Sequence, residues 1–177
     1  MRPLVLPDGI TLEPQTAAHA GAMFHVLSDA ALYALEGEPP ASEAWLRDRF
    51  TRLESRASAD GSEAWLNWVI RLDDGTLAGY VQATVYRAAD TGLADIAYVL
   101  ASRHWGAGLA TRAVQAMIDA LVADHGVTRL RAVLKARNSR SLRLLQRLGF
   151  QPLDAQALST ADIEPDEIAL QRVAHVV

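Results

Sequence analysis

Between residues 93 and 111 the chain has the residue types of a phosphate-binding turn. The apolar run Leu93–Leu100 is typical of a strand, and it leads into a loop that carries Gly106-Ala107-Gly108 before a helical pattern begins. Small residues let backbone N–H groups approach a ligand, and the first turn of a helix offers unpaired N–H groups at a positive dipole end. Phosphate oxygens suit such a place, and Arg103 and Arg112 add positive charge nearby.

The same glycines leave two other interpretations open. One is a turn that only docks a helix on a sheet, and the other is the start of a dinucleotide-binding fingerprint. That fingerprint requires glycine or alanine where Thr111 stands, and an acid about twenty residues later to bind a ribose. Thr128–Arg131 contains no acid, and three strands that look antiparallel precede the loop, so the dinucleotide interpretation is disfavoured.

A second basic segment follows at Asn138–Phe150. Asn138 is a favourable N-cap for a helix. One stripe of this helix is apolar: Leu142, Leu145 and Leu148. Another face is basic, because its arginines recur three and four residues apart: Arg140, Arg143 and Arg147. Such a face could contact a terminal phosphate, although a solvated basic face gives the same pattern.

Charge is distributed unevenly along the chain. Arg103–Phe150 contains eight arginines and Lys135 against Asp119 and Asp124, a net charge of +7, whereas the whole chain carries −4. The rest therefore carries −11. A basic segment in an acidic protein indicates a bound polyanion. The acidic remainder disfavours nucleic acid, which needs a broad basic footprint.

Composition excludes several classes of site. The 177 residues contain no cysteine, which removes disulfides and thiolate chemistry and fits a cytoplasmic location. The five histidines show no metal-ligand spacing, so we expect no metal. No apolar run approaches the ~18 residues of a membrane span, and the N-terminus does not resemble a signal peptide, so we expect no membrane association.

The first half of the chain predicts helices and then strands. Thr11–Glu13 is a short strand candidate. Thr16 and Ser42 are expected to cap two helices, separated by a Gly/Pro-containing break at 36–40. The period then shortens to two, and strands are expected at Trp65–Ile70, Thr76–Arg87 and Leu93–Leu100. Gly79 marks a bulge or a close approach of backbone within the second of these.

The second half alternates between the two periods. A helix is expected from Ala107 or Gly108 to His125, stopped by Gly126. The elements expected after it are a strand at Thr128–Leu134, a helix at Ser139–Leu148, a strand from Gly149 and a strand at Ile168–Val173. The order predicts a mixed α/β sheet in a single domain, residues 1–177.

The two glycine- and arginine-containing segments resemble the cofactor-binding core of the GNAT acyltransferase superfamily. Arg103-His104-Trp105-Gly106-Ala107-Gly108 matches its Arg/Gln-x-x-Gly-x-Gly/Ala loop. Ala94–Thr111 and Asn138-x-x-Ser141, ending in Gly149-Phe150, are similar to the branch that acetylates ribosomal-protein N-termini. The similar region is about 92–150. The resemblance implies a GNAT-like acyl-CoA N-acyltransferase fold: a central, mostly antiparallel twisted sheet flanked by about four helices.

The resemblance also implies acetyl-CoA as cosubstrate and a set of residues that contact it. The loop and the helix start would bind the pyrophosphate. The backbone of the preceding strand would pair with the pantetheine arm, and an N–H there could stabilise the thioester oxyanion. The implied cofactor-binding residues are Tyr98, Val99, Leu100, Arg103, His104, Trp105, Gly106, Ala107, Gly108, Leu109, Ala110, Thr111, Asn138, Ser141 and Arg147.

Two residues are predicted to move protons. The attacking amine must be neutral, and about 14 % of an α-amine is neutral at pH 7, against about 0.04 % of a lysine amine. Asp95 stands where this branch has an acid, usually Glu, and is the candidate general base, acting directly or through water. Many members have a tyrosine as general acid where this chain has Leu145, which leaves Ser141 as a weak substitute.

The acceptor is not identified by the sequence. Tyr33 and Glu36 lie where relatives form a substrate wall, and their side chains are the candidates for binding an amine. The first hypothesis is an N-acetyltransferase that acts on a protein N-terminus or a small-molecule amine. The alternative is a non-catalytic acyl-CoA-binding or regulatory module, which the loss of the tyrosine at Leu145 keeps open. A homodimer is compatible with both.

Overall fold

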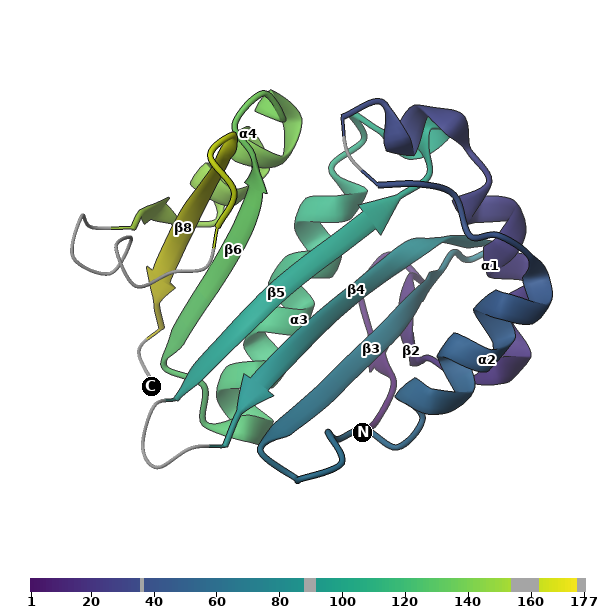
Figure 1. Ribbon diagram of the computed structural model, residues 1–177, viewed down its shortest axis with the longest axis horizontal. Coiled ribbons are helices and arrows are strands. Elements are labelled where there is room, and N and C mark those ends of the chain that lie inside the picture. Colours follow the sequence, from purple (N-terminus) through teal and green to yellow (C-terminus); the bar gives the residue numbers. More distant parts are fainter. Residues whose placement is uncertain (36, 88–91, 154–162, 175–177) are drawn as a thin grey trace.

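A computed structural model describes every residue except 36, 88–91, 154–162 and 175–177 (Figure 1). The strands are β1 (Leu4–Val5), β2 (Thr11–Pro14), β3 (Glu63–Arg71), β4 (Leu77–Tyr86), β5 (Leu93–Leu100), β6 (Arg129–Lys135), β7 (Gln151–Pro152) and β8 (Glu167–Val173). The helices are α1 (Ala20–Leu27), α2 (Glu43–Leu53), α3 (Leu109–His125) and α4 (Ser139–Arg147), with short 3-10 turns η1 (Ala17–His19), η2 (Ala30–Tyr33) and η3 (Ser102–His104). The mixed α/β class is confirmed.

All eight strands belong to one sheet, in the order β1-β2-β3-β4-β5-β6-β8-β7. Neighbours are antiparallel except for β5 and β6, which are parallel. Helix α3 lies behind the sheet in Figure 1, and α1 and α2 cover part of the front beside β3 and β4. The expected mostly antiparallel sheet with four helices is therefore confirmed.

Alternation along β4 distributes its side chains between two apolar clusters. Ala78, Val81 and Ala83 belong to the larger cluster, which also contains the buried stripe of α3, whereas Leu77 packs with α1 and α2 on the opposite face. Fully burying one Leu or Val side chain contributes roughly 1.5–3 kcal/mol to the stability of the folded protein. A few such residues therefore hold each helix layer against the sheet. A strand with two apolar faces must be central, as β4 is.

Strands β5 and β6 pair over only three residues. The register joins Leu93, Ala94 and Asp95 to Arg129, Leu130 and Arg131, and the two strands then diverge towards α4 (Figure 1). Strand β6 continues its pairing with β8, and β5 stays paired with β4 as far as Leu100. No described strand covers the β6-facing edge of β5 after Asp95, which leaves an open backbone edge in the middle of the sheet.

Gly79 is the close-approach point that the sequence predicted. A Cβ built on it would lie 2.0 Å from the carbonyl oxygen of Val99 and 2.9 Å from Cα of Leu100. Any side chain at this position would therefore push β5 away from β4 at the end of β5. The absent side chain lets the β5 backbone cross closely over β4 just where β5 has left β6.

Most predicted helix ends are confirmed by their caps. Ser42 accepts from Trp45 N at 3.0 Å and Asn138 from Ser141 N at 3.1 Å, and Gly126 ends α3 in the left-handed conformation. Thr16 differs, because one 3-10 turn stands between it and α1.

Two strand predictions were inaccurate. β1 was not predicted, since two residues carry too little periodicity. The strand expected from Gly149 begins at Gln151, because the N–H groups of Gly149 and Phe150 still bond to carbonyls of α4, those of Gln146 and Leu145. Among the described helices, none is both long enough and apolar enough to cross a bilayer.

Replacing Gly79 with alanine is expected to destabilise the protein by about 2–3 kcal/mol, because the new Cβ overlaps the Val99 carbonyl. Chemical denaturation measures the change. Gly126→Ala is the matched control, since a Cβ there meets no atom within 4 Å and only the left-handed φ of +64° is strained, at about 1 kcal/mol. Equal losses in the two variants would contradict the close approach as the reason for glycine at position 79.

Candidate functional site

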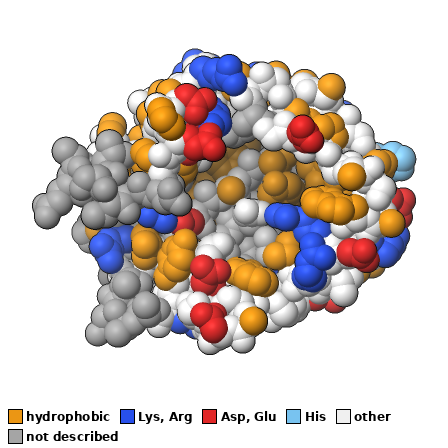
Figure 2. Space-filling model, viewed as in Figure 1, with side chains coloured by type: hydrophobic (Ala, Val, Ile, Leu, Met, Phe, Trp, Pro, Cys, Tyr) orange, Lys and Arg blue, Asp and Glu red, His pale blue; other side chains and the backbone are white. Residues whose placement is uncertain are grey.

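A cavity of about 860 Å³ opens on the front of the sheet, where Figure 2 shows a hollow with apolar side chains inside it. Its lining comes from both sides of the diverging strands. One side consists of the ends of β4 and β5, η3–α3 and the start of α4, and the other of η2, the segment after it and α2. One continuous space thus joins the open edge of β5 to a chamber beneath α2.

Eight of the predicted site residues line this cavity: Tyr33, Tyr98, Val99, Leu100, Trp105, Ala110, Asn138 and Ser141. The structure brings them together from three parts of the chain that are far apart in sequence, around residues 33, 98–110 and 138–141. Glu36 lies outside the described residues. The other predicted residues do not line the cavity: Asp95, Arg103, His104, Gly106, Ala107, Gly108, Leu109, Thr111 and Arg147.

The start of α3 has the geometry expected of an anion-binding turn. Gly106 and Gly108 have φ of +83° and +72°, and Gly108 is the N-cap residue, whose position lacks a side-chain cap. The first N–H groups of α3 are therefore left for a ligand or water. No acid stands in the first turn, and Ala110 there faces the cavity. These features follow from the small residues that the sequence places at 106–110.

The arginines around this turn have partners of their own. Arg112 pairs with Asp8, with Nε 2.8 Å from Oδ2. Arg103 donates to the carbonyl of Leu77 and contacts His104, and burial together with Arg103 lowers the pKa of His104. His104 is therefore neutral at pH 7. Arg112 also donates to the Ala107 carbonyl of the turn, whereas Arg103 has no carboxylate within 4 Å among the described residues.

The start of α4 faces the same cavity across the gap between β5 and β6. The Asn138 carbonyl oxygen caps the helix, so its amide N–H₂ is the group that remains for a ligand. The Arg140 guanidinium lies 3.4 Å from the centroid of the Trp105 ring. This cation–π contact joins α4 to the loop before α3, so it fixes the width of the gap next to the end of β5.

Asp95 is placed away from the cavity. Its carboxylate accepts from Arg131 Nε at 2.7 Å and Nη2 at 2.6 Å, and also from the Tyr86 hydroxyl at 2.7 Å. Burial and the bond to Asp95 raise the pKa of Tyr86 to about 12, and the bond to Asp95 raises the pKa of Arg131. The pair Asp95–Arg131 is the last one that joins β5 to β6. This position favours a structural role for Asp95 over the predicted role as base.

Three tyrosines line the cavity, and all are neutral at pH 7. Burial raises the pKa of Tyr33, Tyr80 and Tyr98. The Tyr98 hydroxyl lies 3.4 Å from the Ser141 carbonyl oxygen, so Tyr98 also spans the gap between β5 and α4. Leu145, at the usual tyrosine position, is only 1 % exposed and packs in the core. It cannot exchange a proton.

Helix α2 supplies lining residues that sequence reasoning missed. Trp45, Arg49 and Leu53 recur every four residues and line the chamber, and the buried Leu46 and Phe50 line it next to them. An ordinary amphipathic helix separates its apolar residues from its charged ones, whereas this face mixes a tryptophan, an arginine and a leucine. The four-residue spacing was the sign in the sequence that these residues share a face. The position of α2 over β4 is needed to see that this face lines a cavity.

One long-range contact closes the outer side of the chamber. Arg137, just before α4, donates from Nη2 to the carbonyl oxygen of Leu35 at 2.6 Å. Leu35 follows η2 and itself lines the cavity. The contact therefore links the two walls that lie on either side of the gap.

Comparison with known proteins agrees with this geometry. The sequence profile described as "Acetyltransferase (GNAT) domain" matches residues 10–151. An uncharacterized N-acetyltransferase of Bacillus licheniformis is 39 % identical over 62 residues, which are 35 % of this chain and 35 % of that protein, so the match spans about a third of the relative.

Solved structures show the same fold. A ribosomal L7/L12 alpha-N-protein acetyltransferase in complex with coenzyme A superimposes with a TM-score of 0.80 at 16 % identity, covering 99 % of both chains. The ribosomal-protein-S5-alanine acetyltransferase of Vibrio fischeri gives 0.77 at 16 %, covering 97 % of this chain and 96 % of the other. An aminoglycoside acetyltransferase in complex with coenzyme A gives 0.72 at 20 %, covering 93 % and 94 %.

Asp95→Asn and Arg131→Met are expected to destabilise the protein by similar amounts, roughly 1–2 kcal/mol each, because both remove the same bidentate pair. The double variant should lose less than the sum, since the interaction is shared. Denaturant unfolding of the four proteins measures this coupling. Additive losses would mean that the pair does not hold β5 to β6.

The same two variants separate a structural from a chemical role of Asp95. If the carboxylate only holds the strands together, activity per folded molecule changes in parallel in Asp95→Asn and Arg131→Met. A loss at least 100-fold larger in Asp95→Asn alone would restore the predicted general base.

Proposed function

The chain belongs to the GNAT acetyltransferase family, and we propose that it transfers the acetyl group of acetyl-CoA to a primary amine, either of a small molecule or of a protein N-terminus. The observation that carries the proposal is the continuous cavity, which runs from the open β5 edge to the chamber beneath α2. Two reactants that enter from opposite sides meet beside Tyr98–Leu100. Holding them in one orientation supplies a large part of the rate of a bimolecular reaction.

The residues of the gap fit an acyl-CoA substrate. An extended pantetheine arm carries amide groups, and the uncovered edge of β5 offers backbone N–H and C=O groups that pair with such a chain as with an added strand. The uncapped start of α3 suits the pyrophosphate. Asn138 and Ser141 face the arm from α4. Acetyl-CoA supplies an activated acetyl thioester with a thiol leaving group, and an N–H of the β5 edge is placed to stabilise the oxyanion.

Proton removal from the amine does not need a carboxylate in the cavity. Glu38 is the carboxylate among the described lining residues, and it lies on the loop after η2 rather than beside β5. An α-amine, of which about 14 % is neutral at pH 7, can lose its proton to water before it enters. The neutral hydroxyls of Tyr98 and Ser141 are the groups near the β5 edge that can accept or donate a hydrogen bond. The chain therefore acts mainly by positioning.

The proposal is tested by acetyl-CoA consumption, read as thiol release, against N-terminal peptides, amino acids, polyamines and aminoglycosides. We expect turnover with at least one of these amines, and an increase of several degrees in melting temperature with saturating acetyl-CoA but not with NAD. Tight acetyl-CoA binding without turnover on any amine would favour the alternative, a non-catalytic acyl-CoA-binding module. Stabilisation by NAD alone would contradict the cofactor assignment.

Ala110→Glu is expected to weaken acetyl-CoA binding at least tenfold, because a carboxylate in the first turn of α3 repels the pyrophosphate. The fold should be retained, since acids are favourable at a helix start. Isothermal titration measures the affinity. Ala123→Glu is the matched control, on an exposed position near the other end of α3. An unchanged affinity in Ala110→Glu would remove α3 from the cofactor site.

A further inference from the structure

Two buried amide groups near the chamber beneath α2 have no partner among the described residues. Gln15 is only 3 % exposed and lines the cavity, and its Nε2 makes no hydrogen bond to any described residue. Asn67, 4 % exposed on the adjacent strand, leaves its Nδ2 unpaired in the same way, but it does not line the cavity. An unsatisfied buried donor is costly, and few occur in folded proteins. Gln15 is therefore the one of the two amides that a ligand in the cavity can contact.

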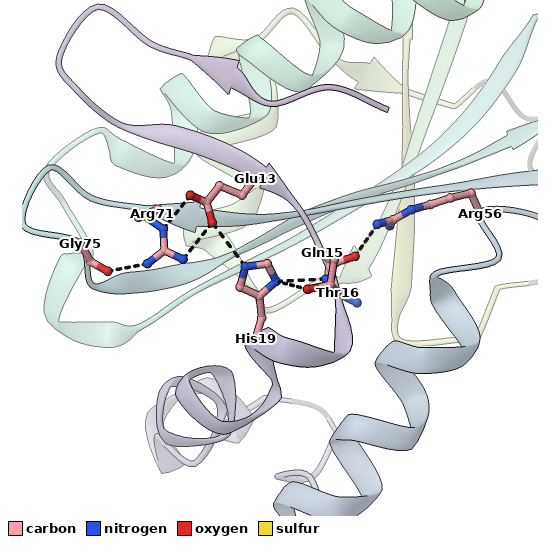
Figure 3. A network of polar contacts seen from close by, with 7 residues as sticks. All are labelled: Glu13, Gln15, Thr16, His19, Arg56, Arg71 and Gly75. Carbon is pink, nitrogen blue, oxygen red and sulfur yellow. Dashed lines mark hydrogen bonds and ion pairs between the residues drawn. The ribbon is translucent and has the colours of Figure 1, made fainter.

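A fixed cation supports the backbone of these two residues. Arg56, from the connection between α2 and β3, donates to the backbone carbonyls of Gln15 and Asn67, as Figure 3 shows for Gln15. Its hydrogen bonds to these two groups go to carbonyl oxygens, and the nearby Glu54 carboxylate stabilises its charge. Burial lowers the pKa of Arg56, but arginine stays protonated.

Farther along the polar network of Figure 3 the charges are balanced. Arg71 is paired with Glu13, with Nε 2.7 Å from Oε1, and it also donates to the Gly75 carbonyl. His19 contacts the same Glu13 carboxylate and the Thr16 hydroxyl. The polar groups in this part of the network are therefore hydrogen-bonded to one another. Among the described residues, the buried side-chain atoms without a hydrogen-bond partner are those of Gln15 and Asn67.

The rim of the chamber carries a second cation. Arg49 lies on the cavity-facing side of α2, 5.8 Å from the centroid of the Trp45 ring. Among the described residues it pairs with no carboxylate within 4 Å. The walls around it are apolar or aromatic, including Leu32, Phe50, Leu53 and Tyr80. A low-polarity wall strengthens the attraction between an arginine and an anion.

We propose that the chamber binds the non-reacting end of the acceptor, and that this acceptor is a small amine with an apolar or aromatic body and a carboxylate, rather than a polycation. The inference rests on the proposed acetyl transfer and names its substrate class. Arg49 attracts the carboxylate, Gln15 donates to its oxygens or to a neighbouring carbonyl, and the aromatic walls cover the body. The charged residues described in the lining are two arginines, Arg49 and Arg140, and one acid, Glu38, so the amino groups of a polyamine would find a single carboxylate among them.

The test compares amines that differ only in the carboxylate: phenylalanine with phenethylamine, and 6-aminohexanoate with hexylamine. Spermidine, kanamycin and an alanine-initiated peptide complete the panel, and thiol release gives kcat/KM. We expect the carboxylate-bearing member of at least one pair to be favoured tenfold or more. Equal values within both pairs, or a preference for spermidine, kanamycin or the peptide, would overturn the inference.

Two variants locate the preference in the chamber. Arg49→Met should reduce the advantage of the carboxylate at least tenfold while the KM for acetyl-CoA stays unchanged. Gln15→Leu should reduce it too, yet raise the melting temperature, because it removes a buried unpaired donor. Arg52→Met is the control, since it removes the same charge from an exposed position of α2 that does not line the cavity. A full carboxylate advantage in Arg49→Met would overturn the assignment.

A binding measurement keeps the two proposals apart. With coenzyme A present, N-acetylphenylalanine should raise the melting temperature more than N-phenethylacetamide, and Arg49→Met should remove the difference. If no amine is acetylated but this difference is seen, the transferase proposal fails and the carboxylate site stands. If amines are acetylated and the two compounds protect equally, the carboxylate site fails and the transferase stands.

Discussion

The early parting of β5 from β6 is the constraint on which the rest of the structure depends. A strand in the middle of a sheet normally has its backbone paired on both sides, and an unpaired buried N–H or C=O is unfavourable. Here β5 is paired with β6 only as far as Asp95, and no described strand covers its edge from there to Leu100, whose carbonyl accepts from Trp105 Nε1 at 2.8 Å. The Asp95–Arg131 pair with Tyr86 holds the strands at the last point of contact. The open edge is stable only if water or an extended ligand completes it.

The elements on either side are arranged around this opening. β6 is drawn away by its full-length pairing with β8, and Lys135 at its end is surrounded by Glu164, Asp166 and Glu167, which raise its pKa. α4 starts directly after β6 and so faces β5 across the gap. Trp105 with Arg140, and the Tyr98 hydroxyl with the Ser141 carbonyl, span that gap without filling it. The sheet thus keeps one slot of defined width that opens towards α2.

Local signals in the sequence predicted the turns at the starts of α3 and α4 far better than the chamber beneath α2. Gly106, Gly108 and Asn138 act on their own turn or cap, so their types and spacing were enough to locate the starts of α3 and α4. Gln15, Arg49 and Tyr80 meet only through tertiary packing, and nothing in their neighbouring residues indicates a shared cavity. Asp95 shows what a motif leaves out: its position predicts chemistry, a prediction that the variants above test, but nothing near it in sequence indicates that Arg131, thirty-six residues later, bonds both of its oxygens. A motif predicts where a residue lies along its strand. The residue that it contacts on the neighbouring strand depends on the register in which the two strands pair.

The charge asymmetry has to be interpreted in the same way. A net +7 over Arg103–Phe150 suggested a polyanion, yet several of these cations are paired with acids from the rest of the chain: Arg112 with Asp8, Arg131 with Asp95, and Lys135 with three carboxylates near 164–167. Much of the asymmetry therefore holds segments together. Arg140 is different, because its contact is the face of Trp105 and it borders the cavity. An anion is attracted by cations that the fold leaves without a carboxylate. The argument for a bound anion therefore depends on the positions of a few such arginines and not on the net charge of the segment.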